Sequence, residues 1–212
     1  AAAGGGAGGG AGMNSVDMNK LEVMVRFSQN NDVAVVCAFY FVSFLFHLKD
    51  NRHKGGGAVA ANESAMSSLA ALGKKSAGDP GLKEAVKTVQ KGLMFVLANL
   101  DLSTYEMLLQ FDISRGKAQP TSDKILYFPA LSGECPALLA RVVHVVLNAT
   151  SYEEGVRANL LIGGDSCSSA LAVGAALGAR FSVPAAWQAR TDASKETSAL
   201  LNEWIKERTL PA

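Results

Sequence analysis

The sequence predicts an all-α fold, and three observations support this prediction. Apolar side chains recur at helical spacing in several segments, most clearly in residues 82–100. No segment alternates apolar and polar residues between hairpin turns, which is the pattern expected of strands. Aromatic residues make up only 7% of the chain while Gly and Ala are abundant, and small side chains suit closely packed helices.

Length, charge and cysteine content narrow the class of protein. The 212 residues suffice for one domain, which we expect over residues 13–212 after a low-complexity Ala/Gly tail over residues 1–12. A net charge of +1 argues against a dedicated nucleic-acid binder. The three cysteines, Cys37, Cys135 and Cys167, do not resemble a disulfide scaffold or a zinc ribbon. Their odd, sparse number favours a reducing compartment, and we expect a cytoplasmic location.

The first two helices are predicted over residues 13–31 and over the apolar run 33–48, with Asp32 as the N-cap of the second. The apolar run has two interpretations, a buried core helix or a membrane span. It is about 16 residues long, short of the roughly 20 that a bilayer needs, and Ser43 and His47 interrupt it. We therefore favour the core helix and expect no membrane partner.

The middle of the chain alternates helices with breaker segments. Charged residues and glycines, together with the turn sequence Asp79-Pro80-Gly81, predict the breaks. Residues 126–131 are ambiguous between a turn and a short extended piece. Helices are predicted over residues 58–72, 82–100 and 102–111, and loops over residues 49–57, 73–81 and 113–123.

Four helices are expected in the last third of the chain. Pro136 suits the first turn of a helix that ends near residue 149. Ser151 and Glu154 form a capping box for residues 152–161. Glycines end that helix, and further helices are predicted over residues 166–179 and 194–208.

In the helix over residues 166–179, small residues recur every four positions. They are Ala170, Gly174 and Gly178, and we expect this stripe to let a second backbone approach closely.

The segment around residues 163–169 is the most informative for chemistry. Gly163 and Gly164 allow a tight turn, and Asp165 then stands at a helix start followed by small polar residues. Such a turn can hold a metal through a carboxylate and hydroxyls, or an anion through free N–H groups. It can equally be structural, with Asp165 or Ser166 as an N-cap only. Composition alone favours the structural interpretation.

This segment resembles the C-terminal signature of the ADP-ribosylglycohydrolase family. Residues 163–168 read GGDSCS where the family usually has GGDTDT, and a small-residue helix, Pro184 and Trp187 follow as in the family. Residues 151–157, SYEEGVR, are similar to the family's S-[FY]-E-E-A-[VI]-R helix, and residues 25–32 to the start of its central helix. The resemblance runs from about Leu21 to the C-terminus, although the region 49–81 matches nothing.

The resemblance implies a fold, a reaction and a set of ligands. The fold is a multi-helix orthogonal bundle, and the reaction is Mg²⁺-dependent cleavage of ADP-ribose from protein side chains or related compounds, through an N- or O-glycosidic bond. Asp165 and Ser168 would be metal ligands, and Cys167 occupies the position of a family aspartate. Gly163, Gly164 and Ser166 would bind ligand.

The sequence also departs from the family pattern. A thiolate is a soft ligand that does not suit Mg²⁺. The family's N-terminal Thr-Asp-Asp cluster, the other half of the magnesium site, does not occur in these 212 residues. We therefore expect a degenerate metal site with weak or no hydrolase activity.

Within the family, the chain looks closer to the jellyfish J-crystallin branch. The alternative function is a non-catalytic, crystallin-like structural protein or a protein that binds ADP-ribose or a related nucleotide. We expect the chain to be the C-terminal part of the domain, incomplete on its N-terminal side. Apolar faces left exposed in this way would lead to self-association.

Two other candidate features have ordinary explanations. Cys167 at a helix start is a conceivable nucleophile, but the histidines His47, His53 and His144 are all distant in sequence. Lysines 83, 87 and 91 form a stripe that we interpret as a solvated helix face, with a phosphate-contacting surface as the alternative. Aromatic residues do not alternate with these lysines, so nucleic acid is not an expected partner.

Overall fold

The computed structural model describes residues 17–54, 57–117, 129–190 and 194–209. No strand occurs among these residues, which confirms the all-α prediction. The predicted tail over residues 1–12 lies outside them. The helices are α1 (Met18–Ser28), α2 (Asp32–Lys54), α3 (Ala58–Lys75), α4 (Pro80–Leu97), α5 (Thr104–Ser114), α6 (Ala137–Asn148), α7 (Tyr152–Ile162), α8 (Ser166–Phe181), α9 (Ala185–Gln188) and α10 (Ser194–Thr209), with a 3₁₀ turn, η1 (Pro129–Leu131).

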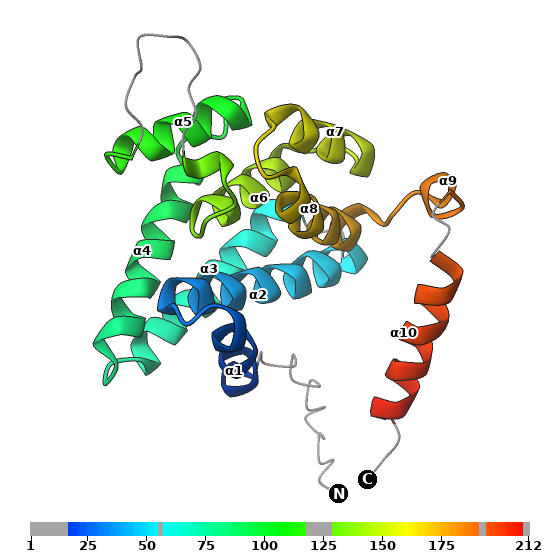
Figure 1. The fold of residues 1–212 in the computed structure, drawn as a ribbon, viewed down its shortest axis with the longest axis horizontal. Coiled ribbons are helices and arrows are strands. Elements are labelled where there is room, and N and C mark those ends of the chain that lie inside the picture. The colour runs from blue at the N-terminus through cyan, green and yellow to red at the C-terminus, as the bar shows by residue number, and fades with distance from the viewer. Residues whose placement is uncertain (1–16, 55–56, 118–128, 191–193, 210–212) are drawn as a thin grey trace, which may run out of the picture.

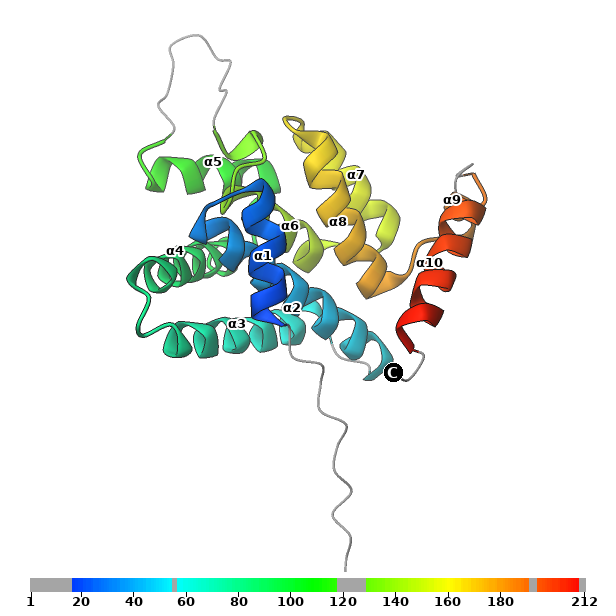
Figure 2. The ribbon, with the colours of Figure 1, turned by 60° about the horizontal axis from the view of Figure 1, so that its bottom comes forward.

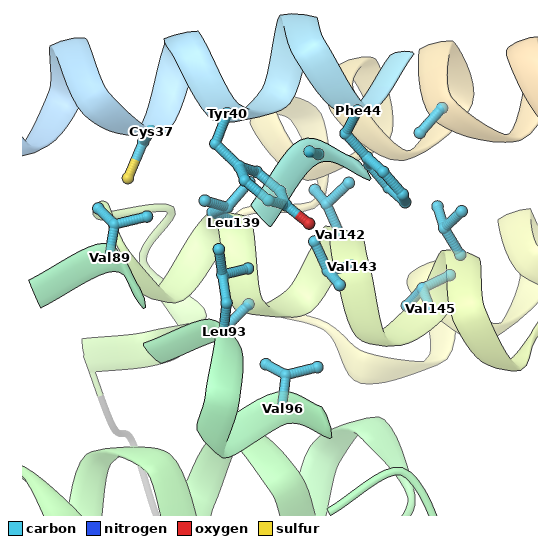
Figure 3. Close-up of a cluster of buried hydrophobic side chains, with 14 of the residues drawn as sticks. Cys37, Tyr40, Phe44, Val89, Leu93, Val96, Leu139, Val142, Val143 and Val145 are labelled. Atoms are coloured by element: carbon cyan, nitrogen blue, oxygen red, sulfur yellow. The ribbon is translucent and has the colours of Figure 1, made fainter. Parts of the chain in front are cut away.

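Helix α2 runs through the middle of the bundle and packs against α1, α3, α4 and α8 (Figure 1). Its buried face carries Tyr40 and Phe44, whose rings stack with centroids 5.8 Å apart. These rings meet apolar residues of α4 and α6 (Figure 3). Asp32–Arg52 is long and apolar enough to cross a membrane, but half of its most apolar stretch is buried in the bundle. Val36, Tyr40 and Phe44 of this helix are buried in the hydrophobic core.

The ends of α2 differ from the prediction. The helix begins at Asp32, and its cap is Asn31, whose side chain accepts a hydrogen bond from the Val33 amide at 2.8 Å. Asp32 instead pairs with Arg26 of α1 at 2.5 Å. At the other end, α2 continues to Lys54 through part of the predicted 49–57 loop, and its Lys49 and Arg52 side chains are exposed. Arg52 there donates a hydrogen bond to Ser182 at 2.6 Å.

The predicted break over residues 73–81 is shorter in the structure. Helix α3 continues to Lys75, and α4 begins at Pro80. Asp79 caps α4 by accepting a hydrogen bond from the Leu82 amide at 3.0 Å, and proline fits a first helical turn because it lacks the amide that would be unpaired there. Gly73 is helical and faces Val86, where a Cβ atom would lie 3.0 Å from Cγ1.

Helices α5 and α6 also shift slightly from their predicted bounds. A capping box between Ser103 and Glu106 starts α5, which continues to Ser114 and so includes the start of the predicted 113–123 loop. Residues 118–128 of the next loop lie outside the described residues, and 129–131 form a 3₁₀ turn. Pro136 is the N-cap of α6 rather than part of its first turn. Almost all of α6 is buried, which makes it the second core helix.

Helices α7 and α8 pack side by side (Figures 1 and 2). The predicted capping box is only half formed: Ser151 caps α7, but the Glu154 carboxylate binds the Thr150 amide instead, at 2.7 Å. The predicted small-residue stripe of α8 is not where α7 and α8 approach most closely. The close approach is at Gly155 of α7, where an added Cβ would lie 2.6 Å from Leu177 of α8.

Candidate functional site

The candidate site is the turn between α7 and α8. Gly163 and Gly164 have φ angles of +73° and +72°, a region that favours glycine, so they end α7 and reverse the chain. The turn lies against η1, where the Asp165 amide donates a hydrogen bond to the Leu131 carbonyl at 2.7 Å. A Cβ on Gly164 would lie 2.4 Å from that same carbonyl oxygen. The predicted turn is therefore present, and contacts with η1 hold it in place.

Asp165 is the N-cap of α8. Its Oδ1 atom accepts a hydrogen bond from the Ser168 amide at 3.1 Å. Its Oδ2 atom lies against Gly133, where an added Cβ would be 2.6 Å away. The interaction with Ser168, aided by the positive charge of Arg141, holds the pKa of the Asp165 carboxyl below its ordinary value. Asp165 is therefore a fixed anion at the start of α8.

A buried arginine holds the turn through hydrogen bonds. Arg141 of α6 is only 2% exposed, and its Nη1 atom donates a hydrogen bond to the Gly163 carbonyl at 2.9 Å. Its Nε and Nη2 atoms donate to the side chain and the carbonyl of Asn159, at 2.8 and 2.7 Å. Burial lowers the pKa of Arg141. One guanidinium thus joins α6, α7 and the turn.

Asn159 and Ser169 continue this support into α8. The Asn159 amide nitrogen donates to the Ser169 hydroxyl at 3.3 Å, and that hydroxyl donates to the Asp165 carbonyl at 2.8 Å. Sequence reasoning missed Arg141 and Asn159 as supporting residues. One signal was available for Arg141, a lone charged residue in the apolar run ALLARVVHVV.

The structure brings together most of the residues predicted for the site. Gly163, Gly164, Asp165, Ser166 and Ser168 share one turn, while Cys167 points into solvent. Within the described ranges, no three His, Cys, Asp or Glu side chains are grouped so as to hold a metal ion.

The donors present in the turn do not fit a pair of magnesium ions. They are one carboxylate already bound to a helix amide, a few hydroxyls and a thiol, whereas Mg²⁺ requires several oxygen ligands in a near-octahedral arrangement.

His144 is engaged elsewhere. Its Nδ1 atom is 2.9 Å from the Thr104 hydroxyl, and its Nε2 atom is 3.2 Å from the Asn99 carbonyl. These contacts join α6 to the start of α5 and to the end of α4. The geometry thus assigns this histidine a structural role.

A cavity of about 480 Å³ lies between α4 and α5. It is lined by the cations Lys87, Lys91 and Arg115, and Glu84 pairs with Lys87 at 3.0 Å. The Arg115 guanidinium lies over the Phe111 ring, 5.2 Å from its centroid. We call this hollow the basic cavity. Two lysines of the predicted solvated stripe therefore line a concave surface.

Comparison with known proteins gives one match. A family model described as ADP-ribosylglycohydrolase matches residues 18–211. No curated protein and no solved structure matches the chain.

Proposed function

The chain belongs to the ADP-ribosylglycohydrolase family, and from this membership we propose that it is an ADP-ribosylglycohydrolase-like protein with a degenerate magnesium site. Its hydrolase activity is weak or absent. The observation that carries this proposal is the position of Asp165, the sole carboxylate of the GGDSCS turn, whose Oδ1 atom accepts a hydrogen bond from the Ser168 amide.

The neighbours of Asp165 support the same conclusion. In the family pattern, Ser168 would supply an oxygen to the metal and Cys167 stands in place of an aspartate. Here Ser168 contributes its amide to the helix cap, and Cys167 carries an exposed thiol that is a poor ligand for Mg²⁺. The substitution at Cys167 also favours the J-crystallin-like branch. In this proposal the turn keeps the two glycines and the first aspartate of the family motif, and its role is structural.

The second candidate function is binding of ADP-ribose or a related nucleotide without hydrolysis. The basic cavity favours it, because Lys87, Lys91 and Arg115 face one hollow that is large enough for a nucleotide-sized ligand. A pyrophosphate carries two negative charges, which the excess of cations over Glu84 would balance. This site would be independent of Asp165.

Calorimetry on the full chain separates these functions. Mg²⁺ and ADP-ribose are titrated separately into the wild type, Asp165→Asn and the double variant K87E/K91E. Asn retains a helix cap while removing the charge, and Asp79→Asn at the matching cap of α4 is the control. We expect no Mg²⁺ heat in any variant. If the basic cavity binds ADP-ribose, K87E/K91E loses this binding and Asp165→Asn keeps it.

Two outcomes would change the proposal. Mg²⁺ binding that Asp165→Asn abolishes and Asp79→Asn retains, together with release of ADP-ribose from ADP-ribosylated arginine or serine peptides, would establish a working metal site. Absence of ADP-ribose binding in the wild type would remove the nucleotide-binding function and leave the structural, crystallin-like one.

A further inference from the structure

We propose that Cys37 and Cys135 form a dithiol site that reacts with small, uncharged disulfides and closes into an intramolecular disulfide. The proposal does not depend on the function proposed above. It concerns a different part of the bundle, where the start of α2 meets the segment that leads into α6.

The two cysteines come from distant parts of the sequence and meet in the fold. Cys37 lies on α2 and is only 4% exposed, and Cys135 immediately precedes Pro136, the N-cap of α6. Figure 3 shows Cys37 pointing from α2 into the core, on the side where Val89 of α4 lies. Both cysteines line one cavity, and each shifts the pKa of the other, so their thiols are close enough to interact. Two thiols in contact are the starting arrangement for a disulfide.

Both thiols line one cavity, which gives a reagent access to them. The cavity has a volume of about 410 Å³ and is bounded by α1, α2, α6 and α8. Apart from Ser28 of α1 and Gln29, which follows it, the residues that line the cavity are apolar or cysteine. An uncharged aromatic disulfide therefore fits this cavity better than a charged one, which would lose its hydration on entering.

The surroundings of each thiol assign the order of reaction. Cys135 is half-buried, whereas Cys37 is almost fully buried, so a reagent reaches Cys135 more easily. The interaction with Cys37 also lowers the pKa of Cys135, while the interaction with Cys135, together with burial, raises the pKa of Cys37 well above its ordinary value. Since the thiolate is the nucleophile, Cys135 attacks first and Cys37 resolves the intermediate.

The reaction consumes one molecule of reagent, written RSSR. The Cys135 thiolate attacks one sulfur, a Cys135–SR bond forms, and the first RS⁻ leaves. Cys37 then loses its proton and attacks the Cys135 sulfur, which expels the second RS⁻. The two cysteines are oxidised to a disulfide, and the reagent is reduced to two thiols that take up the two protons.

Cys167 is exposed at the start of α8 and would react with the reagent by itself. The experiment therefore uses the full chain with Cys167→Ser, so that only Cys37 and Cys135 remain to react. The reagent is 2,2′-dithiodipyridine, an uncharged aromatic disulfide whose released thione is measured by absorbance. Circular dichroism of each variant first verifies that it is folded.

In the Cys167→Ser background we expect two thiones per chain and an intact mass that falls by two hydrogen atoms. Adding Cys37→Ser should give one thione and a stable adduct on Cys135, identified by peptide mapping. Adding Cys135→Ser instead should slow thione release at least tenfold, because Cys37 is buried. Cys→Ala versions of the two variants replace any serine variant that does not fold.

Several results would overturn the proposal. One is a Cys167→Ser chain that retains two adducts, since the two thiols would then have reacted separately. A second is a folded Cys167→Ser chain that releases no thione. A third is equal reaction rates with 2,2′-dithiodipyridine and with the charged reagent 5,5′-dithiobis(2-nitrobenzoate), which would contradict access through an apolar cavity.

Discussion

Two buried polar side chains of α6, Arg141 and His144, hold neighbouring helices in place. Arg141 is 2% exposed and His144 is 1% exposed, so their hydrogen bonds replace those lost to water. Arg141 contacts α7 and the GGDSCS turn, whereas His144 contacts Thr104 at the start of α5 and the Asn99 carbonyl beyond α4. A core helix therefore positions α5, α7 and the GGDSCS turn through polar contacts.

At the residue scale, His144 predicts a dependence of stability on pH. Burial, the larger cause, lowers its pKa below the ordinary 6.5, and the hydrogen bond to Asn99 opposes this only in part. The unfolded chain then binds more protons than the folded one near that pH. The contribution of His144 is therefore fully present above pH 6.5 and is lost as pH falls through the pKa of the folded state.

Urea unfolding at a series of pH values between about 8 and 5 measures this effect. We expect the free energy of unfolding of the wild type to fall as the solution is acidified, and the slope to be smaller in His144→Gln. Glutamine keeps an acceptor and a donor but does not titrate. Equal slopes in the two proteins would show that the loss of stability comes from other groups.

At the scale of elements, glycines at helix contacts have different roles that their positions in the sequence do not reveal. Gly155 of α7 lies against Leu177 of α8, where a Cβ would be 2.6 Å from Cδ1. Gly174 of α8, a member of the predicted stripe, has its nearest neighbour at 3.7 Å, the Tyr152 hydroxyl. Only the first is required by packing.

A pair of alanine substitutions tests this difference. Gly155→Ala should destabilise the protein by about 1–3 kcal/mol, because the added methyl group forces α7 and α8 apart. Gly174→Ala should be neutral or stabilise by up to about 1 kcal/mol, since alanine is the better helix former. Thermal and urea unfolding of both variants measure the effect. Similar losses in the two would show that the α7–α8 contact does not depend on Gly155.

At the scale of the whole molecule, α1 presents apolar side chains to solvent. Val23, Met24 and Phe27 are 72%, 73% and 94% exposed. Helix α1 itself packs against α2 (Figure 2). Exposed apolar surface of this kind favours association between copies of a chain. We therefore expect the predicted self-association to involve α1.

Sedimentation velocity over a range of concentrations tests this expectation. The sedimentation coefficient of the wild type should rise with concentration, and Phe27→Glu should reduce the rise by placing a charge in the apolar surface. Gln29→Glu, which adds the same charge at an exposed polar position nearby, is the matched control and should behave as the wild type. A wild type that stays monomeric throughout would contradict the prediction.

Much of the fold could be predicted because helix ends depend on local chemistry. Glycines at 163 and 164 end α7, and Ser151 and Asp165 cap α7 and α8 as expected. Two of the errors are also local: Asn31 caps α2 in place of Asp32, and Glu154 binds Thr150 rather than Ser151. In both cases two adjacent residues offer a suitable polar group for the same hydrogen bond. The sequence pattern does not show which of the two forms it.

The sequence by itself determined the helical class, most helix bounds, the family and the GGDSCS turn, because periodicity, caps and a short motif are properties of neighbouring residues. Only the tertiary structure decided that Arg141 supports this turn, that Lys87, Lys91 and Arg115 line one cavity, and that Cys37 meets Cys135. Those contacts join residues on different helices. The distances between these residues depend on how the helices pack, and the residues adjacent to each one in the sequence do not determine that packing.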